Sequence, residues 1–198
     1  VGFPVEMSDT LDTVAHNPFD GTLKGTFSAH PHLDPLTGEL HAICYAGTDP
    51  TTIRHVVVNA DGKVVREEPV AVQDGPSIHD CMITQRYALI FDLPLTFSMK
   101  TLLAGHAFPY AWNPDHAARV GLLPRDGKGS DTIWCAVSPC HVFHPCNAYD
   151  TPDGKVIVDL AVHDRMFAES TQGPDSQTVT FERWTIDPVA RTVDRHDI

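Results

Sequence analysis

Short runs of β-branched and aromatic residues, each ending at Gly, Pro, Asn or Asp, follow one another along most of the chain. The turn Asn59-Ala60-Asp61-Gly62 is the clearest boundary, because Asp-Gly between two β-branched runs indicates a hairpin. Runs of mostly ~4–8 residues at this spacing predict an all-β fold, which can be a sandwich, a barrel or a propeller. The predicted strands cover residues 40–45, 54–58, 64–66, 78–84, 87–91, 132–137, 142–148, 155–160 and 178–186.

Residues 97–115 interrupt this pattern, since they are rich in aromatic residues and contain Pro109 and Pro114. We predict a long loop here with one helical turn near Met99–Leu103. Long loops in compact domains often carry function. Three interpretations of the loop stay open: it borders a ligand entrance, it touches a membrane surface, or it folds onto a small core of its own. Its large apolar side chains are Phe97, Leu102, Leu103, Phe108, Tyr110 and Trp112.

Composition excludes several classes of protein. Hydrophobic residues make up 42% of the 198 residues, which indicates a globular chain. The net charge is −12 and Lys and Arg form no cluster, so we expect no nucleic-acid binding and no charge-driven docking on anionic lipid. The 5 cysteines form no CxxC pair, which favours a reducing compartment. No apolar run approaches the ~20 residues that span a bilayer. We expect a cytoplasmic protein whose membrane contact, if any, is peripheral.

The sequence shows no internal domain boundary, because its 16 prolines and 13 glycines are spread along its length. The chain begins at Val1 without methionine or a visible signal peptide, and it stops at Ile198 without an obvious final element. We therefore expect residues 1–198 to be one partial segment from the middle of a longer domain.

Histidine is unusually frequent, with 12 residues, and it is the commonest metal ligand in proteins. His30, His79 and His144 each start or end an apolar predicted strand, and they lie far apart in the sequence. In a propeller, the inner strands of successive blades run side by side along the axis. One histidine per blade at the same height would direct several imidazoles at one ion. This placement predicts a metal site, and the plainer alternative is three ordinary strand-end histidines.

Residues beside these histidines allow other interpretations. Cys140, His141, His144 and Cys146 could form a zinc site, although their spacing is unusual for zinc and Pro145 makes convergence on one face awkward. His32 shares a strand face with His30. Asp80 follows His79 directly, and neighbouring residues of a strand point to opposite faces, so we predict no catalytic role for Asp80.

At these residues the chain resembles the carotenoid cleavage oxygenase family, which includes apocarotenoid-cleaving, stilbene-cleaving and retinal-pigment members. The resemblance runs nearly the whole length of the chain, and its blocks occur in the family's order. They are residues 22–40 around His30, residues 77–95 around Ser77-Ile78-His79-Asp80, residues 120–125, Phe143-His144 with Asn147-Ala148-Tyr149-Asp150, and Arg183-Trp184.

The resemblance implies part of a seven-bladed β-propeller, with loops forming a cap over a non-haem Fe(II) (Fe2+) ion that four histidines hold. By position, His30, His79 and His144 would be three of these ligands. The fourth histidine and the outer glutamates that hold the ligand rings are expected outside this chain, and His196 does not match the fourth motif.

Such enzymes use O2 to split a carbon–carbon double bond into two carbonyl products. The expected partners are O2 and an apolar small molecule, namely a carotenoid, an apocarotenoid or a stilbene. Two alternatives remain at this point. One is a metal-poor propeller that serves only as a binding module, and the other is a zinc protein that uses the Cys140 to Cys146 region.

Overall fold

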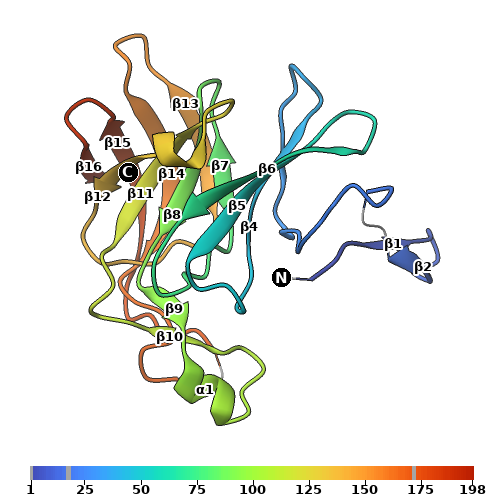
Figure 1. Cartoon of the computed structure of the whole chain (residues 1–198). Helices are drawn as coiled ribbons and strands as arrows, with labels where there is room; N and C mark the ends of the chain where they lie inside the picture. Colours follow the sequence, from blue (N-terminus) through green and yellow to red (C-terminus); the bar gives the residue numbers. More distant parts are fainter. Residues whose placement is uncertain (1, 17–18, 171–172) are drawn as a thin grey trace.

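The computed structural model describes residues 2–16, 19–170 and 173–198, and nearly all of its regular structure is β-strand. Three four-stranded antiparallel sheets follow one another along the chain (Figure 1). Sheet one contains β3 (His32–Leu33), β4 (Leu40–Tyr45), β5 (Thr52–Val58) and β6 (Val64–Ala71). Sheet two contains β7 (Cys81–Ile83), β8 (Tyr87–Asp92), β11 (Arg119–Pro124) and β12 (Ile133–Ala136). Sheet three contains β13 (Pro145–Asp150), β14 (Val156–His163), β15 (Val179–Asp187) and β16 (Thr192–Asp197).

Within each sheet the strands lie in the order in which they occur in the sequence, so every sheet is a meander. Turn chemistry fixes this order locally. Between β5 and β6, Gly62 takes a φ of 74°, which costs glycine nothing, and its N–H donates to the carbonyl oxygen of Asn59 at 2.9 Å. The Asn59 side chain accepts a second bond from the N–H of Lys63. Four-stranded meanders in succession are the blades of a β-propeller.

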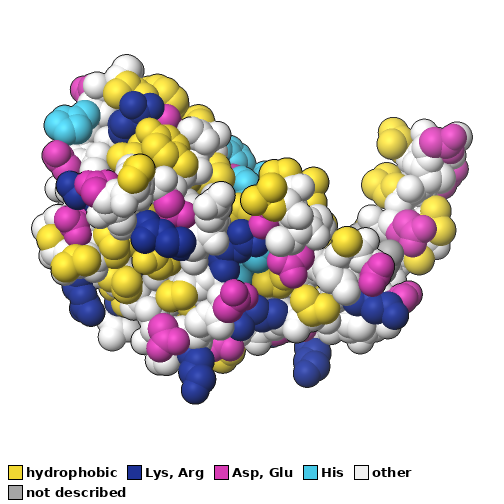
Figure 2. Space-filling view, turned by 90° about the horizontal axis from the view of Figure 1, so that it is seen from above, with side chains coloured by type: hydrophobic (Ala, Val, Ile, Leu, Met, Phe, Trp, Pro, Cys, Tyr) yellow, Lys and Arg dark blue, Asp and Glu magenta, His cyan; other side chains and the backbone are white. Residues whose placement is uncertain are grey.

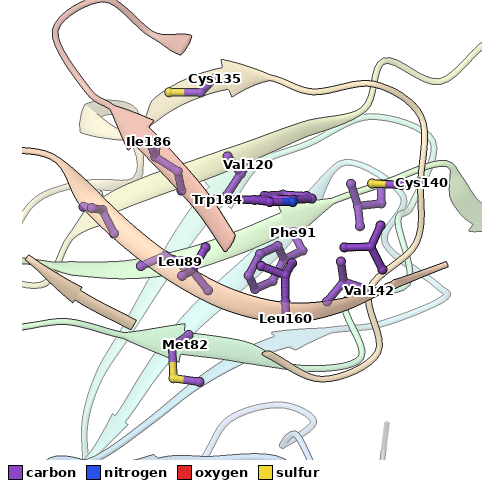
Figure 3. Packing of buried hydrophobic residues seen from close by; sticks show 14 of the residues in the cluster. Met82, Leu89, Phe91, Val120, Cys135, Cys140, Val142, Leu160, Trp184 and Ile186 are labelled. Carbon is purple, nitrogen blue, oxygen red and sulfur yellow. The ribbon is translucent and has the colours of Figure 1, made fainter. Parts of the chain in front are cut away.

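The hydrophobic cores lie between the sheets. The largest cluster joins sheets two and three, where Leu89, Phe91 and Val120 pack against Leu160 and Trp184 (Figure 3). A second cluster joins sheets one and two through side chains such as Ile43, Ile53, Ile90 and Leu123. Neighbouring blades bury their faces against each other. In this packing the first strand of each blade lies innermost, and these strands are β3, β7 and β13. The strand β7 contacts both β3 and β13.

Smaller elements extend from this body. Near the N-terminus, β1 (Val5–Met7) and β2 (Thr13–His16) form a hairpin that lies apart from the three blades (Figure 1). Between β8 and β11 the chain adds β9 (Leu95–Phe97), the helix α1 (Met99–Leu103) and β10 (Tyr110–Trp112). A 3-10 turn, η1 (Gly129–Asp131), precedes β12. No helix within the described residues is long and apolar enough to cross a membrane.

The prediction of an all-β fold that forms part of a propeller is confirmed, and the helical turn at Met99–Leu103 is found as predicted. Two predicted strands begin three residues later than expected. The strand predicted at 78–84 covers only 81–83, and the strand predicted at 142–148 begins at Pro145. In both places the residues before the strand leave the ladder and approach the centre of the molecule. The short strands β1, β2 and β3, the strands β11 and β16, and the pair β9 and β10 were not predicted.

Candidate metal centre

The rings of His30, His79 and His144 meet at one point. Their ring centroids lie 4.6 Å apart for His30 and His79, 4.7 Å for His30 and His144, and 4.9 Å for His79 and His144. One imidazole nitrogen of each lies within 4.8 Å of those of the other two. Three side chains separated by 49 and 65 positions of sequence are thus close enough to share one ion.

The meeting point follows from the blade topology. His30 and His79 each lie two residues before the innermost strand of their blade, and His144 lies directly before β13. Because the three inner strands start at the same end of the molecule, a residue just ahead of each start reaches the same level near the axis. The hollow at the centre of the molecule shows histidine side chains (Figure 2). The sequence-predicted residues are therefore brought together, one from each blade.

The protonation state of His79 suits metal binding. Burial lowers the pKa of His79, and the nearby His30 and His144 lower that pKa further by repulsion between imidazolium charges. A lowered pKa keeps the ring of His79 neutral at physiological pH. Neutral imidazole is the form that binds a metal.

Asp80 contacts the cluster, although no role was predicted for it. Its carboxylate, whose side chain is 6% exposed, accepts from Nδ1 of His144 at 2.8 Å, from Nε2 of His32 at 2.8 Å and from the N–H of Cys81 at 2.7 Å. Burial acts to raise the pKa of Asp80, but the hydrogen bonds from His32 and His144 outweigh it and hold the pKa below its usual value. Asp80 reaches the cluster because β7 begins only at Cys81, so the alternation of side chains between the two faces of a strand does not apply to residue 80.

The bond to Asp80 also separates His32 from His30. Although the two residues are close in sequence, the ring of His30 packs against His79 and His144, whereas His32 turns Nε2 to the carboxylate. A second group of donors that lie close together is His32, Asp80 and Cys81. Burial raises the pKa of the Cys81 thiol, so this residue is a packed core side chain and not an available thiolate.

The structure does not assemble the zinc site considered as an alternative. Among the described residues, the close donor groups contain neither Cys140 nor Cys146. Cys140 is buried, which raises the pKa of its thiol to about 12, while Cys146 is exposed. His141 is buried as well, and burial lowers its pKa to about 3.

An open groove of about 640 Å³ follows the inner strands on from the histidines. All three blades contribute to it, through residues that include His32, Met82, Thr84, Pro145, Cys146 and Ala148. Its lining mixes apolar and polar side chains and includes Pro145, the residue that directly follows His144.

Known proteins are similar to this chain in both sequence and architecture. The family described as "Retinal pigment epithelial membrane protein" matches residues 1–197. A "Carotenoid cleavage oxygenase" of Mycobacterium tuberculosis (strain ATCC 25618 / H37Rv) is 34% identical over 223 aligned positions, which cover 91% of this chain and 44% of that protein. A "Carotenoid 9,10(9',10')-cleavage dioxygenase 1" of Phaseolus vulgaris is 34% identical and covers 75% of this chain and 27% of that protein.

Solved structures agree with these matches. The lignostilbene dioxygenase of Pseudomonas brassicacearum superposes with a TM-score of 0.85 and 30% identity, over 99% of this chain and 43% of that one. A cobalt-substituted Synechocystis ACO superposes with a TM-score of 0.80 and 26% identity, over 99% of this chain and 44% of that one. The chain thus spans less than half the length of these relatives.

Proposed function

This chain belongs to the carotenoid cleavage oxygenase family, and from that premise we propose that it is part of a non-haem Fe(II) dioxygenase. The proposed enzyme cleaves one carbon–carbon double bond of a carotenoid, an apocarotenoid or a stilbene with O2. Both oxygen atoms of O2 end in the products, one on each carbon of the broken bond, so two carbonyl compounds form. The observation that carries the proposal is the meeting of His30, His79 and His144 from three successive blades.

The donor set fits iron. Imidazole suits Fe(II) among the first-row metals, and the group of His30, His79 and His144 contains no carboxylate and no thiolate. Carboxylates near an all-histidine site are expected one layer further out, where they accept the second N–H of a ligand ring. Asp80 occupies such a place against His144. One similar structure is described as cobalt-substituted, so that relative accommodates a transition metal.

Within this proposal, iron would supply the activation of O2, and the residues of this chain hold and orient the site. The three histidines fix the position of the ion relative to the blades. The alkene needs to be held beside that position in a dry, apolar space, since geometry then selects which double bond reacts.

We also propose that the enzyme is cytoplasmic and touches a membrane at its periphery. All five cysteines are free, which fits a reducing compartment. The α1 segment exposes apolar side chains that water solvates poorly, among them Leu103 at 80% exposure. The helix α1 follows β9 directly in the chain. The carbonyl oxygen of Leu95 in β9 accepts a hydrogen bond from the N–H of Ser77, two residues before His79, so α1 lies near the segment that leads into His79. An apolar substrate could pass from a membrane to the site at this end of the molecule.

The test is product analysis with the full-length protein that contains this chain. Purified protein is incubated in air with a panel of carotenoids, apocarotenoids and hydroxystilbenes, and the carbonyl products are identified by mass spectrometry. We expect paired aldehydes or ketones from at least one class, and no products from anaerobic or chelator-treated samples. A protein that binds these compounds without cleaving any of them would instead be the binding module considered as an alternative.

A further inference from the structure

Two buried histidines of sheet one and an arginine of sheet two form a continuous chain of hydrogen bonds. Nη2 of Arg125, the residue after β11, lies 2.7 Å from Nε2 of His41 in β4. Nδ1 of His41 lies 3.1 Å from Nε2 of His55 in β5. We propose that this relay is a proton-sensitive junction, which holds blade one against blade two while both histidines are neutral and opens in mild acid.

The arginine fixes the tautomer of each ring. A guanidinium only donates hydrogen bonds, so Nε2 of His41 must accept. A neutral imidazole has one N–H, which in His41 is then on Nδ1 and donates to Nε2 of His55. The proton of His55 is left on Nδ1, a buried atom that has no partner among the described residues. Neither ring therefore has a free lone pair, and a further proton cannot enter without breaking a bond of the relay.

Protonation would also place like charges and N–H groups against each other. A proton on Nε2 of His41 would face the guanidinium of Arg125, and a proton on Nε2 of His55 would face the N–H of His41. Both rings are almost fully buried, at 2% exposure for His41 and 0% for His55. Burial lowers the pKa of both histidines, and the charge of Arg125 lowers the pKa of His41 further. The folded protein therefore keeps the relay neutral.

Two carboxylates beside the relay do not offset this cost. Glu39 would favour a charged His41, but its Oε2 lies 3.5 Å from Nε2 of that ring and is shared with Arg125 at 3.7 Å. Asp34 bonds directly to Arg125 at 2.6 Å. Both carboxylates thus already compensate the arginine, and this ion pairing keeps the guanidinium in place as the donor to His41.

The remaining charged groups lie around the other end of the relay. After burial and His41, the positive charge of Arg66 lowers the pKa of His55. The carboxylate of Glu68 lies 3.9 Å from Arg66, and both residues belong to β6. An open pocket of about 580 Å³ borders the relay, and its lining includes His41, Arg66 and Asp126. Protons from the solvent can reach His41 through this pocket, so the junction is buried but not sealed.

These contacts set the direction of the pH effect. A histidine whose pKa falls on folding stabilises the closed form fully above the unfolded pKa of ~6.5, and this contribution is lost as the pH decreases. Each proton that only the open form binds favours opening by up to about tenfold per pH unit. Because His30 belongs to blade one and His79 to blade two, opening would separate two members of the histidine cluster. Loss of a bound metal in mild acid would follow, and only that consequence rests on the proposed function.

Buried cysteines at two junctions provide the test. Cys81 lies in the apolar cluster between sheets one and two, whereas Cys135 and Cys140 lie in the cluster between sheets two and three. All three thiols are free and buried. The full-length protein is treated, from about pH 8 to about pH 4.5, with a pyridyl disulfide that modifies thiols even in acid. Mass spectrometry of the peptides then identifies which cysteine is labelled at each pH.

Three variants isolate the relay. The double variant His41→Gln/His55→Gln keeps amide donors and acceptors in the relay but removes both groups that titrate. The single variant His41→Gln is milder and serves if the double variant does not fold at pH 8. The matched control is His116→Gln, because His116 is also buried but its partners Asp92 and Asp74 raise its pKa. Loss of His116 should therefore give no protection against acid.

In wild type, labelling of Cys81 should increase about tenfold or more between pH 6.5 and pH 5, while Cys135 and Cys140 stay protected. The double variant, and to a lesser degree His41→Gln, should keep Cys81 protected at pH 5, and the control should label at least as fast as wild type.

Three results would overturn the inference. They are protection of Cys81 in wild type at pH 5, simultaneous labelling of all three cysteines, and unchanged labelling of Cys81 in the folded relay variants. Because thiol labelling requires neither a metal nor a substrate, each of these results would leave the proposed function standing.

Discussion

At the scale of single residues, the place of a histidine relative to the start of its strand decides what it does. His30 lies two residues ahead of β3 and its ring joins the cluster, whereas His32 is the first residue of β3 and donates to Asp80. His116 lies away from the cluster and is held between two carboxylates, Asp92 at 2.8 Å and Asp74 at 3.0 Å. The same residue type thus serves as a candidate ligand, a hydrogen-bond donor and a structural cation.

His116 gives a prediction about pH. Its hydrogen bond with Asp92 raises its pKa, burial opposes this, and Asp74 raises the pKa further. The other charge near this group is Arg119, which shares Asp92. A histidine whose pKa is raised on folding stabilises the protein fully below its unfolded pKa of ~6.5, and this contribution disappears as the pH rises through the folded pKa.

His116→Gln removes this contribution. At pH 5.5 the variant should be less stable than wild type by about 1.5–3 kcal/mol, the value of a hydrogen bond to a charged group. The difference should shrink by pH 8.5. Thermal unfolding of the full-length protein and the variant across this range measures it, and the comparison cancels the titration of other histidines. A stability difference that is constant or grows with pH would contradict the assignment.

The residue scale also shows what sequence could and could not predict. The three clustered histidines were predictable, because each flanks an apolar strand and matches a family block. The contact of Asp80 with His144 was not, because it depends on β7 starting three residues later than the apolar pattern indicates and on a partner 64 positions away. Side chains alternate between the two faces of a sheet only where the strand is hydrogen-bonded to a neighbouring strand, so this rule does not place residues that come before the strand.

At the scale of elements, the strand β11 shows why a pattern can mislead. Its sequence contains Gly121 and ends at Pro124, which is typical of a connection rather than of a strand. In the sheet, however, Gly121 lies opposite Trp134, and a Cβ on the glycine would come within 2.7 Å of the indole ring. Glycine is needed there to make room for Trp134, over which Arg119 stacks at 3.9 Å. A cross-strand neighbour of this kind cannot be read from one segment.

The strand β16 was missed for a different reason. It carries Asp194, Arg195 and Asp197 and is largely exposed, so it lacks an apolar pattern. Among the described residues it pairs with β15 alone, and it forms the outer edge of the third sheet. Charged side chains are common on such edges because they discourage pairing with other chains.

The α1 segment gives a prediction at the element scale. Met99, Leu102 and Leu103 are exposed on a helix that carries one lysine, so contact with a membrane would depend on apolar insertion and not on charge. Leu103→Glu should reduce binding of the full-length protein to phosphatidylcholine vesicles, measured by cosedimentation, about fivefold or more. Wild-type binding should change little with salt.

Val189→Glu is the matched control, because Val189 is 93% exposed in the turn between β15 and β16. This variant should bind vesicles like wild type. Equal binding by wild type and the Leu103 variant would remove the α1 segment from the membrane proposal, and equal loss in both variants would show an effect of charge alone.

At the scale of the whole molecule, three successive blades each provide one of the three imidazoles that meet in the histidine cluster. The sheets pack face to face through continuous apolar clusters, and this packing sets the distances between histidines that are far apart in sequence. The all-β class and the succession of blades were predictable from strand spacing and family resemblance. The packing of Trp184 against Phe91, which aligns blades two and three, was not, because it depends on which faces meet.

The central claim is that His30, His79 and His144 hold one metal ion together. The most direct test is elemental analysis of the full-length protein purified after expression in iron-supplemented medium, in parallel with His30→Ala, His79→Ala and His144→Ala. The account predicts about one iron per wild-type chain and a loss of most of that iron in each variant, because imidazoles are the protein donors at this site. Wild-type protein without iron, or folded variants that retain it fully, would contradict the account.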